Sequence, residues 1–239
     1  MSSSTNKPSK VLVLGGSRGI GAAIVRRFAA QGAHVTFTYV NSRESAEKLA
    51  AQTGSKALHL DSADRTALIS TIESLGAIDV LVANAGVLRT GNPLEISPVE
   101  IDYLFQVNIN ASYHAAVSAA KNMPDNGRIV LIGSTNADRI PMGNASAYAA
   151  SKSALQGMVK GLARDFGERG ITVNVVQPGP TDTDMNPANG PRKDFMHSFM
   201  AIKRHVKDEE VAAMVAWLAS AEANMVTGAA LTVDGGFAA

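Results

Sequence analysis

The sequence predicts a doubly wound α/β fold, in which a parallel sheet carries helices on both of its faces. Two observations predict it. Short apolar runs, typical of strands buried on both faces, alternate along the whole chain with longer segments of helical periodicity. The first apolar run, residues 11–14, is followed by a glycine-rich turn and then by an amphipathic helix. Strand, glycine-rich turn and helix in this order form a phosphate-binding unit, so the fold is expected to be Rossmann-like.

The strands are expected where apolar and β-branched residues cluster between turn residues. This criterion predicts about seven strands, each buried within the sheet. They cover residues 11–14, 34–39, 56–60, 78–83, 128–132, 172–177 and 231–233.

The helices are expected where apolar residues recur with the period of an α-helix. Gly32 ends the first helix, Asp64 caps the third, and Pro98 lies near the start of the fourth. The helices are predicted after the glycine-rich turn, at residues 42–51, after Asp64, at 97–121, at 147–166 and after Asp208. Residues 181–193 are polar and irregular, and residues 181–205 are expected to form a lid on the substrate side.

The composition excludes several classes of protein. With 239 residues and 46% hydrophobic content, the chain is expected to form one domain over residues 10–239, after a flexible tail at residues 1–9. The net charge of +1 gives no reason to expect nucleic acid as a partner. The absence of cysteine excludes disulfides and thiolate metal sites. The longest apolar run, residues 211–219, is too short to cross a bilayer, so a cytoplasmic location without membrane association is expected.

Three spaced glycines define the expected phosphate-binding turn. Gly15, Gly19 and Gly21 lie between the first strand and the first helix. Glycine lets the backbone approach a phosphate closely and lets the helix pack tightly on the strand. The spacing differs from the G-x-G-x-x-G pattern of many dinucleotide-binding proteins, so the flanking strand and helix are needed to make the signal specific.

Tyr148 and Lys152 are the first candidates for chemistry, because a separation of four residues places them on one face of a helix. A nearby ammonium group favours the phenolate, so Lys152 is expected to lower the pKa of Tyr148 and suit it to proton transfer. Ser134, after the fifth strand, could hydrogen-bond a substrate oxygen beside this tyrosine. The alternative is a half-buried aromatic residue beside a solvated lysine.

Taken together, these motifs resemble the short-chain dehydrogenase/reductase family over residues 10–236. The matching pieces are residues 15–21, Asp61, residues 84–86, Asn108, Ser134, residues 148–152, residues 178–179, Thr183 and residues 226–236. The resemblance implies an NADP-dependent oxidoreductase that interconverts a small-molecule carbonyl and an alcohol.

The resemblance also implies a role for each matching residue. Tyr148 corresponds to the general acid, Lys152 to the residue that holds the nicotinamide ribose and depresses the tyrosine pKa, Ser134 to the substrate-orienting hydroxyl, and Asn108 to a member of a proton relay. The cofactor-binding residues implied are Gly15, Ser17, Arg18, Gly19, Ile20, Gly21, Tyr39, Ser42, Arg43, Asp61, Ser62, Asn84, Ala85, Gly86, Tyr148, Lys152, Pro178, Gly179, Thr181 and Thr183.

Two positions depart from the family pattern. Leu14 stands where the family usually has a threonine, so a hydroxyl that braces the turn is missing. Thr135 has the more common spacing to Tyr148, and Ser134 is one residue farther away. Ser134 is preferred as the active-site hydroxyl because it ends the strand and one extra loop residue costs little. Asp61 has an alternative role as the cap of the turn that follows it.

The end of the second strand predicts NADPH as the preferred cofactor over NADH. NAD-specific sites usually place an acid there to bind the ribose 2′-hydroxyl, and this chain has none before Glu44. Arg18 and Arg43 are positioned in sequence to donate to a 2′-phosphate.

A narrower resemblance leads to an alternative function. Residues 133–134, 138–139, 186–191 and 200–205 resemble the cyclic-di-GMP-binding biofilm dispersal mediators of this family. The alternative is therefore a regulator that binds cyclic-di-GMP on a dehydrogenase fold. Asp138 and Arg139 follow Ser134, so one hypothesis directs Arg139 into the cleft toward an anionic ligand, with Asp138 fixing its geometry.

The predicted helix at residues 147–166 suggests self-association. Met158, Val159, Leu162 and Phe166 offer more apolar positions than contact with one sheet requires, and the family resemblance implies a homodimer or homotetramer. The alternative is that this helix simply contributes to the core. The five histidines show no metal-ligand spacing, so no metal site is predicted.

Overall fold

The computed structural model describes residues 9–239, so the predicted flexible tail lies, apart from Ser9, outside the described residues. A seven-stranded sheet of order β3-β2-β1-β4-β5-β6-β7 forms the centre of the molecule, and every neighbouring pair of strands is parallel. The strands are β1 (Lys10–Leu14), β2 (His34–Tyr39), β3 (Lys56–His59), β4 (Val80–Ala83), β5 (Arg128–Ile132), β6 (Thr172–Pro178) and β7 (Ala230–Val233).

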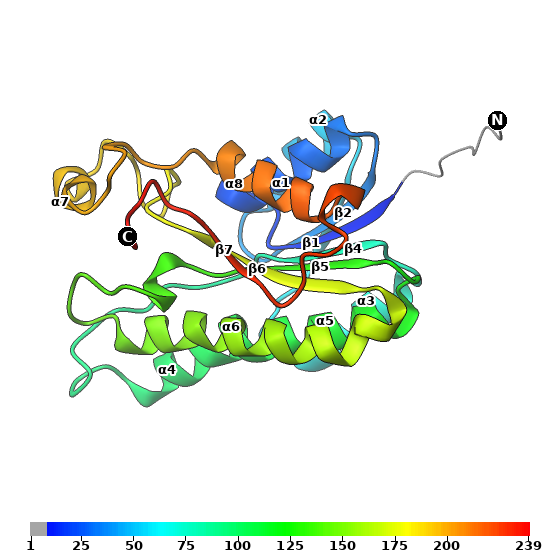
Figure 1. Cartoon of the computed structure of the whole chain (residues 1–239), viewed down its shortest axis with the longest axis horizontal. Coiled ribbons are helices and arrows are strands. Elements are labelled where there is room, and N and C mark those ends of the chain that lie inside the picture. Colours follow the sequence, from blue (N-terminus) through cyan, green and yellow to red (C-terminus); the bar gives the residue numbers. More distant parts are fainter. Residues whose placement is uncertain (1–8) are drawn as a thin grey trace.

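Helices cover both faces of this sheet (Figure 1). One layer contains α1 (Gly19–Ala30), α2 (Arg43–Thr53) and α8 (Asp208–Leu218). The other contains α3 (Arg65–Ser74), α4 (Pro98–Phe105), α5 (Ala111–Asn122) and α6 (Ser146–Phe166). A short helix, α7 (Lys193–Ser198), lies away from both layers, near the carboxyl end of the sheet.

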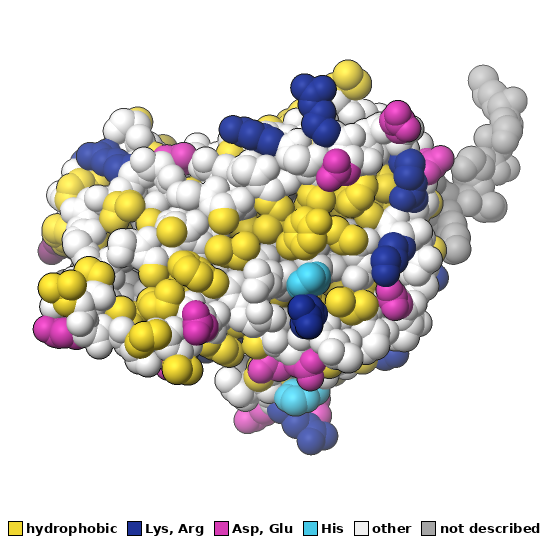
Figure 2. All heavy atoms as spheres, turned by 90° about the horizontal axis from the view of Figure 1, so that it is seen from below, with side chains coloured by type: hydrophobic (Ala, Val, Ile, Leu, Met, Phe, Trp, Pro, Cys, Tyr) yellow, Lys and Arg dark blue, Asp and Glu magenta, His cyan; other side chains and the backbone are white. Residues whose placement is uncertain are grey.

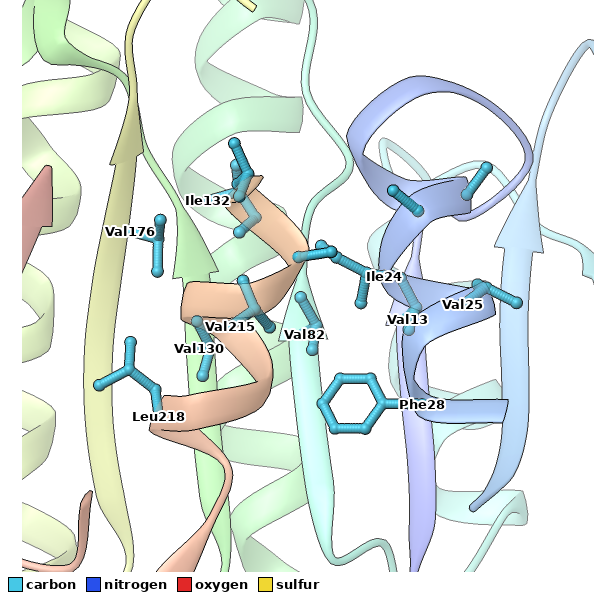
Figure 3. Packing of buried hydrophobic residues seen from close by; sticks show 14 of the residues in the cluster. Val13, Ile24, Val25, Phe28, Val82, Val130, Ile132, Val176, Val215 and Leu218 are labelled. Carbon is cyan, nitrogen blue, oxygen red and sulfur yellow. The ribbon is translucent and has the colours of Figure 1, made fainter. Parts of the chain in front are cut away.

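The two cores follow from the two-residue period of the strands. In β1, Val11 and Val13 belong to the core under α1 and α8, whereas Leu12 and Leu14 belong to the core under α3, α5 and α6. Figure 3 shows the first core, in which Phe28 and Val215 meet the valines of the central strands. Burial on both faces explains why these strands are continuous apolar runs.

The predicted fold class is therefore confirmed, and the strands and helices lie within a few residues of their predicted positions. The predicted helix at residues 97–121 is one helical stretch, but a π-helical turn (Gln106–Asn110) separates α4 from α5. The irregular stretch after Thr181 ends in α7, which the sequence did not predict.

The prediction that the apolar side chains of α6 exceed what the sheet requires is wrong for two of them. Val159 and Leu162 are buried in the core of their own chain, and Met158 and Phe166 pack against the same core. Among residues 9–239, no helix is both long and apolar enough to span a membrane.

The strand order has a consequence for ligand binding. The chain passes from β1 through α1 to β2 on one side, and β4 lies on the other side of β1. The connections from β1 and to β4 therefore run to opposite sides of the sheet centre. Such a reversal of strand order opens a crevice beyond the carboxyl ends of the strands.

Candidate active site

A cleft of about 440 Å³ lies at the carboxyl ends of the strands. It is lined by nearly all of the residues that the sequence predicted for the site: Gly15, Ser17, Arg18, Gly19, Ile20, Gly21, Tyr39, Ser42, Asp61, Ser62, Asn84, Ala85, Gly86, Ser134, Tyr148, Lys152, Pro178, Gly179, Thr181 and Thr183. Arg43 and Asn108 are predicted site residues that do not line it.

The glycine-rich turn is built so tightly that it tolerates no side chain at two of its glycines. Gly15 has a φ of +72°, and a Cβ atom there would lie 2.9 Å from the Cα atom of Ala85. A Cβ atom on Gly21 would lie 2.1 Å from the carbonyl oxygen of Gly15. The turn therefore brings the N-terminus of α1 and its free N–H groups to the floor of the cleft.

Thr38 braces this turn from the second strand, a role that sequence reasoning missed. The N–H of Gly15 donates to the Thr38 hydroxyl at 3.0 Å, and the N–H of Gly16 donates to the Thr38 carbonyl at 2.9 Å. The side-chain amide of Asn84 also donates to the Gly15 carbonyl, at 2.7 Å. A buried hydroxyl on the neighbouring strand thus provides a brace where Leu14 offers none.

Ser134 and Tyr148 meet in the cleft. Both line the cleft wall, and the Ser134 side chain is close enough to the Tyr148 phenol to oppose the rise in its pKa that burial causes. Thr135 is buried, and its hydroxyl donates to the carbonyl of Pro178 at 3.3 Å. The geometry therefore supports Ser134, rather than Thr135, as the hydroxyl available to a ligand beside Tyr148.

Lys152 is buried beneath the same part of the cleft. Its ammonium group donates to the carbonyl of Ile132 at 2.9 Å and lies 5.9 Å from the centre of the Tyr148 ring. Burial lowers the pKa of Lys152 to about 8. The ammonium group also lies at the backbone of Gly86, where a Cβ atom would be 3.4 Å away. The alternative of a solvated surface lysine is excluded.

The expected lowering of the Tyr148 pKa does not occur in this structure. Burial raises the pKa of Tyr148, and the neighbouring Ser134 side chain opposes this shift without reversing it. Because Lys152 points its ammonium group at the Ile132 carbonyl, its charge does not outweigh the cost of burying a phenolate. The phenol is therefore protonated near neutral pH, as it would be at its ordinary pKa of about 10, and this is the form that can donate a proton.

Asn108 lies behind the cleft wall, on the π-helical turn between α4 and α5. Its amide oxygen accepts from the N–H of Val87 at 2.9 Å, and its amide nitrogen donates to the carbonyl of Val87 and the hydroxyl of Ser151, both at 3.0 Å. Asn108 therefore connects the loop that follows β4 to α6, the helix that carries Tyr148.

The remaining charged candidates divide into residues that face the cleft and residues that do not. Asp61 lines the cleft while its carboxylate accepts from the N–H of Ala63 at 2.8 Å, so it also closes the turn after β3. Arg18 lines the cleft at the start of α1. Arg43 is exposed and forms an ion pair with Glu47, with 2.7 Å between Nε and Oε1.

The hypothesis that Arg139 points into the cleft is wrong. Its guanidinium donates to the backbone carbonyls of Phe237, at 2.8 Å, and Ala239, at 3.0 Å. Asp138 does not fix it, because the Asp138 carboxylate accepts from the side-chain amides of Gln156 and Gln177. The sequence contained no signal for these partners, which are far away along the chain.

The predicted lid contributes the opposite wall of the cleft. From it, Thr183, Met185, Asn186, Arg192 and Met196 line the cleft. Met142 and Phe237 add apolar side chains from other segments, and neither was predicted from the sequence. The cleft lining therefore combines apolar side chains with polar and charged side chains of the lid, among them Asp184 and Arg192.

Comparisons with known proteins agree with this geometry. A family profile described as enoyl-(acyl carrier protein) reductase matches residues 15–238. The chain is 62% identical, over 96% of its length and 97% of the relative, to the cyclic-di-GMP-binding biofilm dispersal mediator protein of Escherichia coli (strain K12). The chain belongs to the short-chain dehydrogenase/reductase family.

Solved structures of this short-chain dehydrogenase/reductase family share the whole fold. The crystal structure of BdcA in complex with NADPH has a TM-score of 0.95 and 61% identity, covering 97% of this chain and 95% of that one. A short chain dehydrogenase from Burkholderia cenocepacia J2315 in complex with NADP has a TM-score of 0.94 and 45% identity, covering 97% and 98% of the two chains. The family resemblance read from the sequence is therefore confirmed.

Proposed function

We propose that this protein is an NADPH-dependent oxidoreductase that interconverts a carbonyl compound and an alcohol, with Tyr148 as its proton donor. The observation that carries the proposal is that Ser134, Tyr148 and the buried Lys152 line the same cleft as the glycine-rich turn. Two similar structures of the family were solved with NADPH or NADP bound, which supports the choice of cofactor.

The residues around the turn fit a dinucleotide. The absence of Cβ atoms at Gly15 and Gly21 leaves backbone N–H groups at the N-terminus of α1 open to a pyrophosphate. Asp61 and Ser62, which line the cleft, would hold the adenosine end of the cofactor, and Asn84 and Gly86 would hold the ribose nearer the reacting centre. NADPH, when bound, supplies a hydride to the carbonyl carbon.

Tyr148 and Ser134 act on the carbonyl oxygen. The Ser134 hydroxyl donates a hydrogen bond that orients this oxygen, and the Tyr148 hydroxyl transfers its proton to it. The phenol of Tyr148 is protonated near neutral pH, since burial raises its pKa from an ordinary value that already lies well above neutral. The apolar wall excludes water from the developing charge.

Lys152 and Asn108 support this pair. The buried ammonium group of Lys152 lies at Gly86, where it can hold a ribose hydroxyl of the cofactor. Asn108 keeps the loop after β4 and the helix of Tyr148 in register through its contacts with Val87 and Ser151. Loss of either residue should disturb the position of the reacting groups.

Loss of NADPH fluorescence in the presence of a panel of aldehydes and ketones tests the proposal. At least one carbonyl compound should be reduced with formation of the corresponding alcohol, identified by mass spectrometry. A protein that binds NADPH but reduces no member of a broad panel would contradict the enzymatic assignment.

A second candidate function is the binding of cyclic-di-GMP, and it is favoured by the name of the Escherichia coli relative at 62% identity. The phosphate groups of such a ligand could use the same N-terminus of α1. Calorimetric titration of cyclic-di-GMP with and without saturating NADPH tests whether this ligand binds and whether it binds in the cofactor cleft. Competition would place the ligand in the cleft, simultaneous binding would place it elsewhere, and no binding would remove this candidate.

A further inference from the structure

Arg139 joins two segments that form different walls of the cleft. It follows the short 3₁₀ helix Thr135–Ala137, directly beyond Ser134. Its guanidinium donates to the backbone carbonyls of Phe237 and Ala239 at 2.8 and 3.0 Å. The loop that carries the active-site hydroxyl is thereby tied to the segment that follows β7.

An aromatic contact strengthens the same connection. The guanidinium carbon of Arg139 lies 5.6 Å from the centre of the Phe199 ring, within the range of a cation–π contact. The Phe199 ring meets the Phe237 ring edge to face, with 6.0 Å between centres. Arg139 therefore holds Phe237 through its backbone carbonyl and also through a neighbouring ring.

Phe237 is the part of this arrangement that lines the cleft. Its side chain is 2% exposed and lines the cleft together with Met142 and Met196. These three side chains come from the loop after β5, from α7 and from the segment after β7. No single element places this apolar wall, so its shape depends on contacts between the segments.

The segment that carries Phe237 is also held by burial of the Phe237 ring in the core and by contacts with the lid. The Asp234 carboxylate accepts from the N–H groups of Gly236 and Ala238, both at 2.9 Å, which folds the segment onto itself. The carbonyl of Gly235 accepts from the N–H of Ile202 at 2.9 Å, which ties it to the lid. Gly235 and Gly236 both have positive φ, a conformation that favours glycine. The link to the loop of Ser134 is made by Arg139.

We propose that Arg139 is a positioning residue that fixes Phe237 as the wall of the substrate pocket and thereby sets preference for carbonyl compounds with a bulky apolar or aromatic group. The inference rests on the proposed function, which supplies carbonyl compounds as the substrate class. One terminal nitrogen of the guanidinium, Nη1, donates to both carbonyls, while the guanidinium carbon lies 5.6 Å from the centre of the Phe199 ring. These contacts give the Arg139 guanidinium a structural role, because it lies against backbone carbonyls and the Phe199 ring.

Steady-state kinetics with ketones of increasing apolar size test the proposal. Arg139→Ala should raise KM for the bulky aromatic ketones by about threefold to tenfold, the factor expected when hydrogen bonds that hold a binding group are lost. KM for the smallest ketones and Kd for NADPH should change by less than about twofold. Phe237→Ala should also raise KM for the bulky ketones more than KM for the small ones. Arg139→Lys should restore part of the low KM for bulky ketones that Arg139→Ala loses.

Arg169→Ala is the matched control. Arg169 also donates to two backbone carbonyls, of Ala120 and Met123, but it precedes β6 and does not line the cleft. Its loss should lower stability without changing the size preference. An Arg139→Ala variant whose KM changes equally for small and bulky ketones would overturn the proposal.

Hydrogen exchange of residues 234–239 provides a readout that is independent of turnover. The amides of Gly236 and Ala238 should exchange faster in Arg139→Ala than in the native protein, and their exchange should stay unchanged in Arg169→Ala. Unchanged exchange in Arg139→Ala would overturn the proposal. If the native protein reduces no ketone, the proposed function fails, and this measurement alone decides whether Arg139 holds Phe237.

Discussion

Single residues decide how well the cleft can bind and react. The turn after β1 depends on Thr38, because the Thr38 hydroxyl accepts from the N–H of Gly15 and is almost fully buried. Without that acceptor, a backbone donor beside the phosphate site would lack a partner. The hydroxyl therefore contributes both to stability and to the shape of the turn.

Thr38→Val should lower the free energy of unfolding by about 1–3 kcal/mol, because it leaves a buried N–H without an acceptor at almost constant side-chain volume. It should also weaken NADPH binding, whereas Thr38→Ser should retain both properties. Urea denaturation and fluorescence titration measure the two effects, with Thr36→Val on the same strand as control. Native stability together with native affinity in Thr38→Val would contradict the bracing role.

Tyr148→Phe removes the proposed proton donor but keeps the ring. We expect kcat to fall by about 100-fold or more, as for loss of a general acid, while Kd for NADPH remains close to native. Tyr113→Phe, on the exposed surface of α5, is the control and should have native activity. Full activity in Tyr148→Phe would show that another group donates the proton.

Cofactor preference is expected to depend more on Arg18 than on Arg43. Arg18 lines the cleft, whereas Arg43 is exposed and paired with Glu47. Arg18→Ala should therefore narrow the difference in Kd between NADPH and NADH, and Arg43→Ala should narrow it less. Arg27→Ala, an exposed arginine of α1 outside the cleft, is the control. Equal affinities of the native protein for both cofactors would refute the preference itself.

At the scale of elements, a pair of histidines attaches α7 to the last residue of the lid. His197 in α7 and His205 lie 2.8 Å apart between Nε2 and Nδ1. Burial lowers the pKa of His205, and the neighbouring His197 lowers it further. A hydrogen bond between two imidazoles requires that at least one facing nitrogen is unprotonated. Protonation of both rings would therefore break the attachment.

The stability of the protein should fall as the pH drops below the range in which an unfolded histidine titrates, about 6.5. Because the pKa of His205 is lower in the folded state, its contribution is complete above this value and is lost as the pH falls toward the folded pKa. His205→Gln should show a smaller drop in Tm between neutral and mildly acidic pH than the native protein. The raised pKa of Asp208 acts on both proteins alike, so the comparison isolates His205. Identical drops would contradict this role.

The π-helical turn is a second feature of this scale. It interrupts one long helix at Asn108 and separates α4 from α5. The periodicity of the sequence predicts the helix but cannot distinguish this turn from ordinary α-helix, since one inserted residue shifts the register only locally. The contacts of Asn108 with Val87 and Ser151 show what the turn positions.

For the whole molecule, the exposed face of α4, α5 and α6 is the candidate surface for self-association. Figure 2 shows hydrophobic side chains gathered on this side of the molecule. Val99 and Tyr103 of α4 and Tyr113 of α5 are exposed large apolar residues. The α6 residues first considered for this role, Val159 and Leu162, lie in the core instead.

We expect a symmetric homodimer or homotetramer at micromolar concentration, measured by light scattering. The double variant Val99→Asp and Tyr113→Asp should shift the protein toward smaller species, because it places charges in a contact that excludes water. Lys48→Asp on α2, on the opposite face of the sheet, should have no effect. A native protein that is only monomeric would contradict the prediction.

The sequence by itself determined the strands, the helices, the glycine-rich turn and the pairing of Tyr148 with Lys152, because all of these depend on spacing over a few residues. The tertiary structure decided that Ser134 rather than Thr135 faces Tyr148, that Thr38 braces the turn, and that Arg139 binds Phe237 instead of a ligand. It also reversed the expected pKa shift of Tyr148. These properties depend on which distant segments meet and how much water they exclude, and neither can be read from local spacing.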